Sequence, residues 1–204
     1  MWQASRVSGV RDVGDDEVRP VAAALARAFH DDPVMTWLFG DHTGRRLRRL
    51  RRFFVHEARR HRAMGEVVTD DGLHGAAFWD PPGRWKETWG DVLRSVPALL
   101  PAIGPRIPRA LRGLSLIEAA HPREPHWYLS ILGTEPAAQG RGIGGRLMTP
   151  VLDRCDEQGL GAYLESSKEQ NLAFYGRFGF AVTGEIALPQ GPPLWPMWRE
   201  PKAP

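Results

Sequence analysis

Residues 139 to 147, QGRGIGGRL, combine four glycines with two arginines and form the stretch best suited to holding an anion. Successive glycines let several backbone N–H groups point into one concavity, and a helix that begins there adds a partial positive charge. Arg141 and Arg146 add full charges. The ligand that these features favour is a diphosphate. The alternative is structural, because such glycines can also serve only to let a helix pack closely.

The same stretch matches the dinucleotide fingerprint G-x-G-x-x-G, with Glu165 twenty positions beyond Gly145. In a Rossmann site, however, the first glycine follows its strand directly. Here TEPAAQ separates Gly133 from Gly140, and the remaining chain looks mixed rather than repeatedly parallel. A phosphate-binding loop of the Walker type would need Lys-Ser or Lys-Thr at its end, which this stretch lacks. We therefore interpret the loop as a cradle for a different anion.

Regular elements flank this loop. HWYLSILGT, residues 126 to 134, is a near-continuous apolar strand, and the chain after Gly142 predicts a helix with one apolar face and a bend at Pro150. The apolar positions of that helix are Ile143, Leu147, Val151, Leu152 and Cys155, and Gly159 and Gly161 mark its end. AYLES is a strand, NLAFYGRFG a short helix that Gly179 stops, and FAVTGEI a further strand. PLWPMWRE suits an edge strand, because its prolines exclude a central position.

The first half predicts helices followed by a hairpin. VSGVRDV is a strand, and Asp15 or Asp16 can cap the helix EVRPVAAALARAFH. Pro33 suits the first turn of a second helix through Trp37. EVVTDDGLHGAAFWDPP is a hairpin whose turn lies at Asp70-Asp71-Gly72, since Asp-Gly supplies the backbone angles of a tight turn. Four prolines divide residues 83 to 120 into short helical pieces, interpreted either as a cover over a pocket or as a packing layer.

Basic charge is concentrated in one window. Residues 45 to 62 hold nine arginines and one glutamate, so the net charge of +3 leaves the rest of the chain acidic. Apolar residues at helical spacing favour a solvated amphipathic helix. Nucleic-acid or anionic-membrane binding is disfavoured because no recognised motif or aromatic platform accompanies the arginines. Contact with a second subunit in a homodimer, or a contribution to binding an anionic cofactor, stays open.

The composition of the 204 residues predicts one globular domain spanning 1–204. Cys155 is the single cysteine and no stretch reads as a signal peptide or membrane span, so we expect a soluble, cytoplasmic protein. The histidines show no metal-ligand spacing, and no metal is expected. A Gly-x-Ser-x-Gly or Cys-His hydrolase arrangement is not evident either.

Gln139, Gly142 and Gly144 form a Q-x-x-G-x-G pattern after a strand ending in LGTEP, which resembles the acyl-CoA-binding motif of the GNAT superfamily of N-acetyltransferases. NLAFYGRFGF resembles the next motif of that superfamily, with Asn171 and Tyr175 in register. AFHDDPVMTWLF and most of the chain after residue 121 are similar to the puromycin N-acetyltransferase branch. The resemblance covers nearly the whole chain and is weak between residues 83 and 118.

This resemblance implies an α/β (α+β) fold with a mixed, mostly antiparallel central sheet flanked by helices. Two parallel strands, HWYLSILGT and AYLES, would splay apart around the pantetheine arm of acetyl-CoA, the expected acyl donor. Backbone groups of Leu132 and Thr134 would bond the pantetheine, the amides from Arg141 to Gly145 would hold the pyrophosphate, and Asn171 would contact the pantetheine or the cysteamine end. The whole expected cofactor site is Leu132, Gly133, Thr134, Gln139, Gly140, Arg141, Gly142, Ile143, Gly144, Gly145 and Asn171.

By the same resemblance Tyr175 is the general acid that supplies a proton to the departing thiolate, as a phenol with a pKa of about 10 can. The structural alternative is one aromatic side chain on a packed helix face. Glu165 and His126 are the candidate bases, each with a structural alternative, and a water chain is a third route. Asp31, Asp32 and Trp37 are candidates for binding the acceptor, although helix termination explains the two aspartates equally well.

The function expected from these residues is acetyl transfer to a primary amine of a small molecule by direct attack in a ternary complex. Acetylation of a peptide or protein amine is the nearest alternative. A non-catalytic acyl-CoA sensor is a second alternative, from a different class.

Overall fold

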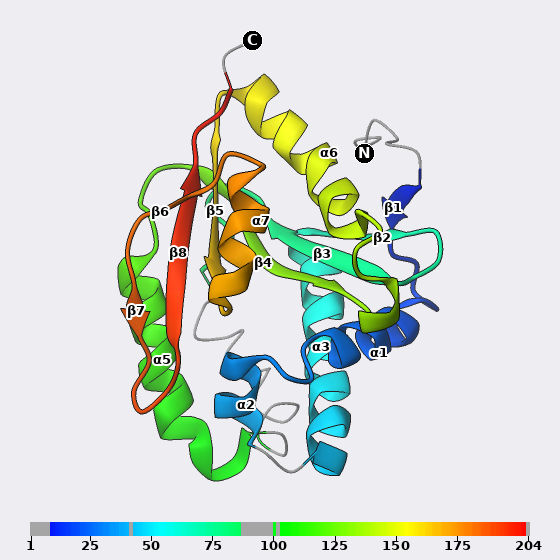
Figure 1. Cartoon of the computed structure of the whole chain (residues 1–204), viewed down its shortest axis with the longest axis vertical. Helices are drawn as coiled ribbons and strands as arrows, with labels where there is room; N and C mark the ends of the chain where they lie inside the picture. The colour runs from blue at the N-terminus through cyan, green and yellow to red at the C-terminus, as the bar shows by residue number, and fades with distance from the viewer. Residues whose placement is uncertain (1–8, 41–42, 87–99, 101–102, 203–204) are drawn as a thin grey trace.

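A central sheet runs through the protein, with helices on both of its faces (Figure 1). The structure is a computed structural model that describes residues 9–40, 43–86, 100 and 103–202. In this part of the chain the sheet has eight strands in the order β1-β2-β3-β4-β5-β8-β6, and β7 also pairs with β8. The bounds are β1 Val10–Asp12, β2 Glu66–Asp70, β3 Gly75–Asp80, β4 His126–Thr134, β5 Gly161–Ser166, β6 Ala181–Val182, β7 Ile186–Ala187 and β8 Pro193–Arg199.

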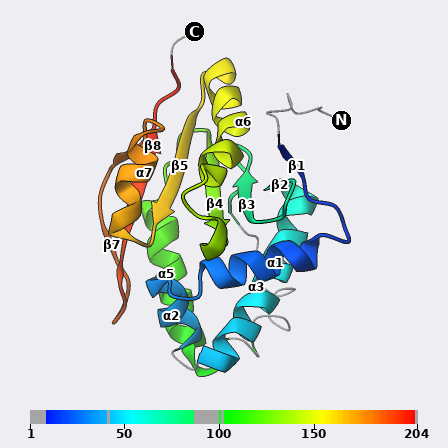
Figure 2. The same cartoon turned by 45° about the vertical axis from the view of Figure 1, so that its right-hand side comes forward.

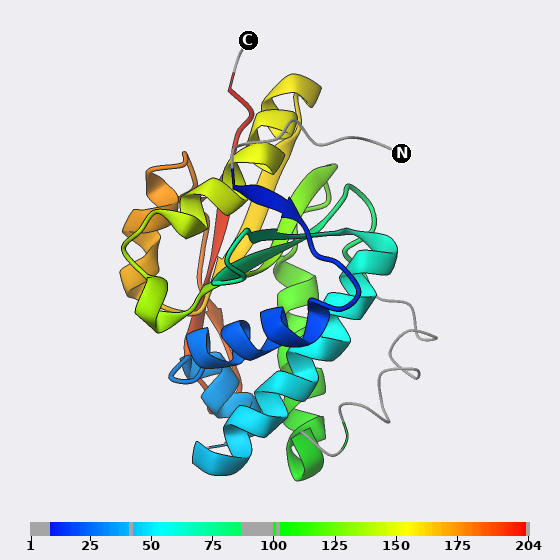
Figure 3. The ribbon, with the colours of Figure 1, turned by 90° about the vertical axis from the view of Figure 1, so that its right-hand side faces the viewer.

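Alternating side chains of β2 and β3 serve two separate cores. Ala77 and Trp79 face α6 (Ile143–Gln158) and α7 (Leu172–Gly176), whereas Ala76 and Phe78 face α1 (Val18–Ala28) and α3 (Thr43–Met64). Figures 2 and 3 show these two helical layers from the side. The buried face of α6 contains all five apolar positions expected from the sequence. The alternation of side chains along each strand therefore determines which helices pack on each face of the sheet.

The described residues contain further helical elements. They are α2 (Pro33–Phe39), α5 (Ile107–Ala120) and three 3-10 turns, η1 (Gly104–Arg106), η2 (Pro136–Ala138) and η3 (Glu169–Asn171). The predicted short second helix is α2, which begins at Pro33 and is capped by Asp32, whose Oδ1 accepts a hydrogen bond from Met35 N at 2.9 Å. Much of the predicted helical segment 83 to 120 lies outside the described residues, and its later part is the continuous helix α5.

The strands β4 and β5 form the parallel pair, and they separate after a short paired stretch. Their register joins His126, Trp127 and Tyr128 to Gly161, Ala162 and Tyr163, and no pairing follows although β4 continues to Thr134. On its other side β4 is paired with β3 from Tyr128 to Thr134, with an irregularity at Phe78/Trp79 that leaves Ser130 as the extra residue. A bulge of this kind bends the strand that carries it. The mixed, mostly antiparallel sheet with a splayed parallel pair is thus confirmed.

The edge position predicted for PLWPMWRE is wrong. β8 lies between β5 on one side and β6 and β7 on the other (Figure 1). The carbonyl of Pro196 accepts a hydrogen bond from Thr183 N, so the side of Pro196 that lacks an N–H faces the break between β6 and β7. The ladder to β5 consequently loses no donor at this residue.

Two local predictions also need correction. The residue before α1 is Glu17 rather than an aspartate cap, and its carboxylate bonds Gly14 N and Arg11 instead of a helix amide. In the β2–β3 turn the left-handed residue is Leu73, with φ of 56°, and not Gly72. The carboxylate of Asp70 accepts hydrogen bonds from the amides of Gly72 and Gly75, which stabilises this longer turn.

The arginine-rich window forms α3, as predicted, and several of its arginines hold the first layer together. Arg49 donates to the carbonyl of Phe39, Arg46 donates to Thr36, and Arg62 pairs with Asp15. Other arginines of the helix, among them Arg52, are exposed to solvent. None of the helices in the described residues combines the length and the apolar character needed to cross a membrane.

Candidate functional site

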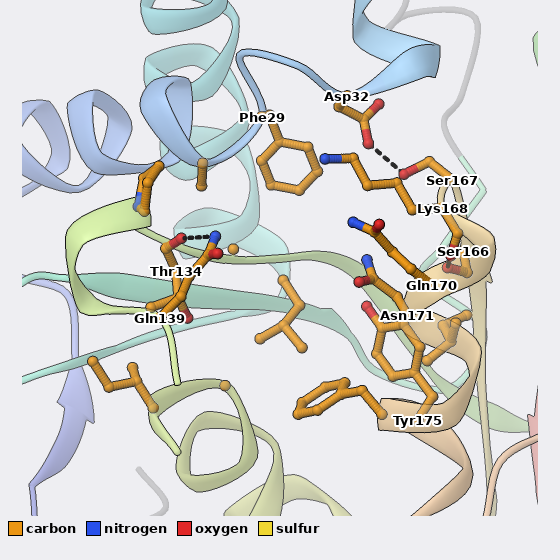
Figure 4. A pocket seen from close by; sticks show the side chains of 18 of the residues that line it. Phe29, Asp32, Thr134, Gln139, Ser166, Ser167, Lys168, Gln170, Asn171 and Tyr175 are labelled. Atoms are coloured by element: carbon orange, nitrogen blue, oxygen red, sulfur yellow. Dashed lines mark hydrogen bonds between the residues drawn. The ribbon is translucent and has the colours of Figure 1, made fainter. Parts of the chain in front are cut away.

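A cavity of about 870 Å³ occupies the opening between β4 and β5 (Figure 4). One wall is β4 from Leu129 to Thr134, and the other is β5 with the following Ser167 and Lys168. The N-terminus of α6 and one side of α7 complete it, together with residues 27 to 32 at the end of α1. Because the strands are unpaired here, their backbone groups are available to a ligand that inserts between them.

The glycine loop forms one end of this cavity. Gly140 and Gly142 have φ of 77° and 74°, a conformation that side chains with a Cβ rarely adopt. The first backbone bond of α6 runs from Arg146 N to Gly142 O at 3.1 Å. The preceding amides of the turn therefore have no acceptor within the helix and can bind an anion.

Gln139 fastens this loop to the end of β4. Its Nε2 donates a hydrogen bond to the carbonyl of Thr134 at 3.1 Å, and both side chains border the cavity in Figure 4. Gly133 lies beside it for a packing reason, since a Cβ there would meet Phe29 and Leu25 of the first layer at 2.7 and 2.8 Å. The hydrogen bond from Gln139 and the close packing at Gly133 thus hold the loop and the end of β4 in place.

Tyr175 reaches the cavity from α7, next to Asn171 (Figure 4). The ring is buried among Phe174 and Phe180, which fits the structural role foreseen for it, yet the same residue lines the cavity. Burial raises the pKa of the Tyr175 phenol above its ordinary value, and the Asp32 carboxylate adds to the effect. The phenol therefore stays protonated near neutral pH and can serve as a proton donor.

Two adjacent aspartates meet β5 across the cavity. Asp32 is 3% exposed and accepts a hydrogen bond from the Ser167 hydroxyl, whereas Asp31 pairs with Lys168 Nζ at 2.9 Å. Burial raises the pKa of Asp32, although the hydrogen bonds from Ser167 and Met35 oppose it. The hydrogen bond and charge of Lys168 lower the pKa of Asp31. Asp32 therefore caps α2, as helix termination predicts, and it also lines the cavity, while its binding of the acceptor stays a prediction.

Glu165 lies on β5 and also lines the cavity. Its Oε2 accepts a hydrogen bond from the Tyr128 hydroxyl at 2.7 Å. Burial, followed by the charge of Glu165, raises the pKa of Tyr128 well above its usual value, so this phenol remains a donor. The carboxylate is consequently positioned by a neighbouring strand, and its side chain is 7% exposed.

His126 is buried at the paired start of β4 and does not line the cavity. Its Nδ1 lies 2.6 Å from the carbonyl of Glu124 and its Nε2 lies 3.0 Å from Nε2 of His121. Burial lowers the pKa of His126. The sequence drew attention to His126 but not to His121, which belongs to the loop between α5 and β4.

The cavity brings together most of the predicted site residues. Those lining it are Asp31, Asp32, Leu132, Gly133, Thr134, Gln139, Gly140, Gly142, Ile143, Gly144, Glu165, Asn171 and Tyr175. Arg141, Gly145, His126 and Trp37 do not line it. Arg141 donates to the carbonyl of Ala137 on the outer side of the loop, and a Cβ on Gly145 would meet the Phe178 ring at 2.8 Å, so Gly145 sets the spacing between α6 and α7.

Trp37 lines a second, more open cavity of about 610 Å³ that shares Asp31 with the first. Its Nε1 donates to the carbonyl of Pro189 at 3.0 Å, and the Arg109 guanidinium lies over its ring. Arg106 of the segment 83 to 120 also lines this cavity. No part of the described segment lines the first cavity.

Sequence reasoning missed several residues that line the first cavity. Arg177 and Lys168 bring positive charge to it, and Phe29 and Ser130 contribute from α1's end and from the bulge. Arg177 had no usable signal, because residues two apart on a helix point in different directions and Arg177 follows the end of α7 at Gly176. Ser130 had no signal, since the bulge depends on pairing with β3. Within the described part of the chain, no group of three or more His, Cys, Asp or Glu side chains could hold a metal ion.

Comparisons with known proteins agree with this geometry. Residues 106–180 match the model of the acetyltransferase (GNAT) family. An uncharacterized N-acetyltransferase from Schizosaccharomyces pombe is 30% identical over 201 residues, which cover 91% of this chain and 81% of that protein. The chain therefore belongs to the GNAT family of N-acetyltransferases.

Solved structures extend the likeness to the whole fold. A histone acetyltransferase HPA2 and related acetyltransferase from Corynebacterium glutamicum has a TM-score of 0.72 and 25% identity, covering 96% of this chain and 97% of that one. The polyamine N-acetyltransferase of Drosophila melanogaster has a TM-score of 0.60 at 17% identity and covers 94% and 98%. The second likeness concerns the fold alone.

Proposed function

We propose that this protein transfers an acetyl group from acetyl-CoA to a primary amine of a small molecule, by direct attack in a ternary complex. The observation that carries the proposal is the shared cavity, into which the splayed strands, the amides at the start of α6 and the Tyr175 phenol all open. Members of the family use acetyl-CoA as the acyl donor. The free amides and the glycines at 140 and 142 fit its pyrophosphate, and the unpaired edge of β4 fits its pantetheine amides.

Bound acetyl-CoA supplies a thioester carbonyl that an amine can attack. In our proposal Leu132, Gly133 and Thr134 orient the pantetheine, and Asn171 contacts its cysteamine end. The other proposed cofactor contacts are Gln139, Gly140, Arg141, Gly142, Ile143, Gly144 and Gly145. Arg141 and Gly145 would act through their backbone amides, since neither lines the cavity. Arg177 is added to this set because its guanidinium borders the same opening.

The acceptor ammonium must lose a proton and the sulfur must gain one. We assign the second task to Tyr175, whose raised pKa keeps its proton until a strong base such as a thiolate is present. We assign the first task to Glu165, which lines the cavity. His126 is the second candidate base, although it does not line the cavity. Asp31, Asp32 and Trp37 are proposed to bind the acceptor: Asp31 lines both cavities, Asp32 lines the first and Trp37 lines the second.

The small-molecule acceptor is supported by structural neighbours that are N-acetyltransferases of agmatine and of polyamines. Similarity to the puromycin N-acetyltransferase branch makes aminonucleosides a further acceptor class to test. A second candidate is acetylation of a peptide amine, which the neighbour named as a histone acetyltransferase favours. One domain and a cytoplasmic location, where the buried free thiol of Cys155 would stay reduced, complete the proposal.

Replacement of Tyr175 by Phe tests this function. We expect the variant to bind acetyl-CoA as the wild type does and to lose about 10²- to 10⁴-fold in turnover, because only the proton donor is removed. Thiol release would be measured with aminonucleosides, polyamines, aminoglycosides, amino acids and peptides, and binding by calorimetry. The Tyr175 hydroxyl bonds no other described residue, so unchanged unfolding free energy is the control. Equal turnover in both proteins would remove Tyr175 from the mechanism.

Failure of the whole panel to release CoA, despite tight acetyl-CoA binding by the wild type, would contradict the enzymatic proposal. It would support a non-catalytic acyl-CoA sensor instead. Turnover confined to peptides would favour the second candidate.

A further inference from the structure

His121 lies beside Glu165 and has no role in the mechanism proposed above. Its side chain is 1% exposed and is enclosed by aromatic rings, with Trp85 stacked at 3.5 Å between centroids and Tyr128 and Tyr163 edge-on. A histidine buried in this way needs its two ring nitrogens matched to partners.

The hydrogen bonds around His121 determine where its proton lies. Nδ1 of His126 is 2.6 Å from the carbonyl of Glu124, and a carbonyl can only accept, so this nitrogen carries the hydrogen. Nε2 of neutral His126 is then an acceptor. It lies 3.0 Å from Nε2 of His121, which must therefore donate. Neutral His121 accordingly presents the lone pair of Nδ1 on its opposite side.

That lone pair faces a second acceptor. Nδ1 of His121 lies 3.7 Å from Oε1 of Glu165, and neither atom has a hydrogen-bond partner among the described residues. The other oxygen, Oε2, already accepts from Tyr128. Two buried acceptors facing each other are unfavourable, and one proton between them satisfies both.

Among the titratable groups around Glu165, the pair of Glu165 and His121 is the best place for an additional proton. Burial and the charge of Glu165 raise the pKa of Tyr128 and of Tyr163, so both phenols stay neutral. Asp80, whose charge acts on Tyr128, and Glu124, whose charge acts on His126, are the other acidic groups nearby. His126 is a poor site for a positive charge because burial lowers its pKa.

We propose that Glu165 and His121 act as one proton acceptor, in which His121 is a positioning residue that shares the proton received by Glu165. This inference rests on the proposed amine acetylation. An N–H bond of the acceptor ammonium breaks, its electron pair stays on nitrogen, and the proton bonds to the Glu165 carboxylate, whose buried Oε1 lies 3.7 Å from Nδ1 of His121. The charge of the pair changes from −1 to zero. The proton leaves to solvent through the cavity after the product departs.

The pairing can be tested without any substrate, by following the ring nitrogens of His121 with ¹⁵N–¹H NMR across pH. In the wild type we expect neutral His121 to be the Nε2–H tautomer, with its hydrogen on the nitrogen that faces His126. In Glu165→Gln the Nδ1 resonance of His121 should shift, because the carboxylate that faces this nitrogen is replaced by an amide. An Nδ1–H tautomer of neutral His121, or an Nδ1 resonance that is unchanged in Glu165→Gln, would overturn the proposal.

The role in turnover is tested with His121→Gln, using His74→Gln as the matched control at an exposed histidine of the β2–β3 turn. We expect the acidic limb of kcat/KM to move to lower pH in His121→Gln and the maximal value to fall at least tenfold, with KM for acetyl-CoA unchanged. His74→Gln should keep the wild-type profile. A parallel loss at every pH without movement of the limb would contradict proton sharing.

These outcomes separate the two proposals. If no amine is acetylated, the proposed function fails while the NMR result still decides the pairing. If turnover is normal but the Nδ1 resonance of His121 does not respond to Glu165→Gln, the pairing fails and the function stands. Should His121→Gln not fold, the tautomer of His121 in the wild type still provides the decision.

Discussion

Asp32 caps a helix and also lines the cavity. It caps α2 through Met35 N, accepts from Ser167 and lines the cavity, all while 3% exposed. A buried carboxylate with few compensating charges is expensive to ionise, and this is why its pKa is raised. The neighbouring Asp31 is exposed, pairs with Lys168 and has a lowered pKa.

This contrast predicts opposite pH dependences for two variants. Below about pH 4 Asp32 is largely protonated in both the folded and the unfolded chain, so Asp32→Asn should unfold with a free energy near that of the wild type. As the pH rises toward the raised pKa, the wild type should lose stability relative to Asp32→Asn. The loss amounts to about 1.4 kcal/mol for each pH unit that separates the folded pKa from the unfolded one. Asn retains the cap. Urea denaturation from pH 3.5 to 8 measures the difference.

Asp31→Asn is the control of opposite sign. Its lowered pKa contributes stability above the unfolded value that is lost as the pH falls, so Asp31→Asn should be slightly less stable than the wild type only at neutral pH. The same slope for both variants would contradict the assignment of their environments.

At the scale of elements, α6 and α7 must keep a fixed spacing so that the glycine loop and Tyr175 open into one cavity. Gly145 sets this distance because the ring of Phe178 packs where its Cβ would lie, at 2.8 Å. The ring of Phe174 is similarly close to Gly144, at 3.3 Å. Gly144 and Gly145 thus serve helix packing, and this role is compatible with the anion site proposed for the same loop.

Gly145→Ala should therefore destabilise the protein by about 1–3 kcal/mol and weaken acetyl-CoA binding, because α7 must shift to admit the methyl group. Gly176→Ala, in the exposed part of α7, is the matched control: nothing lies within 4 Å of its Cβ and its φ is ordinary. There we expect a change between zero and about 1 kcal/mol of stabilisation. Thermal unfolding and calorimetry would measure both, and equal stability of the two variants would count against the packing argument.

At the scale of the whole molecule, the most basic element is α3, and it lies away from the cavity. None of the residues of α3 lines it, and several arginines of that helix bond the first layer instead. The cations that border the cavity are Arg27, Lys168 and Arg177, of which Arg27 pairs with Glu135 and Lys168 with Asp31. Arg177 lies over the Phe174 ring and has no carboxylate partner among the described residues.

Arg177→Gln should weaken acetyl-CoA binding about tenfold at low salt, as expected for loss of one charge-assisted contact of ~1.5 kcal/mol. Arg52→Gln, at an exposed position of α3, removes the same charge and should leave the dissociation constant unchanged. Titrations at several salt concentrations should show a shallower salt dependence for Arg177→Gln alone. An equal effect of both substitutions would indicate that only net charge matters.

Local patterns in the sequence were sufficient for most helices and strands and for the glycine loop at the end of the cavity. Apolar periodicity placed the buried face of α6, and Pro33 marked the start of α2. The spacing of Gln139, Gly142 and Gly144 indicated a loop that the structure places beside the cavity. These features depend on residues that are close together along the chain. Asn171 and Tyr175 were placed correctly beside the cavity for the same reason, since their short motif follows β5 directly.

Only the tertiary structure decided which distant residues meet. β8 is central because the short strands β6 and β7 pair with its outer side, and the bulge at Ser130 depends on pairing with β3. Trp37 contacts Pro189 and Arg109, and these contacts place it beside the second cavity. His121 comes to face Glu165 because the loop after α5 returns to the sheet beside β5. Strand pairing and side-chain burial join residues far apart in the chain, and their free energies depend on partners that no local pattern specifies.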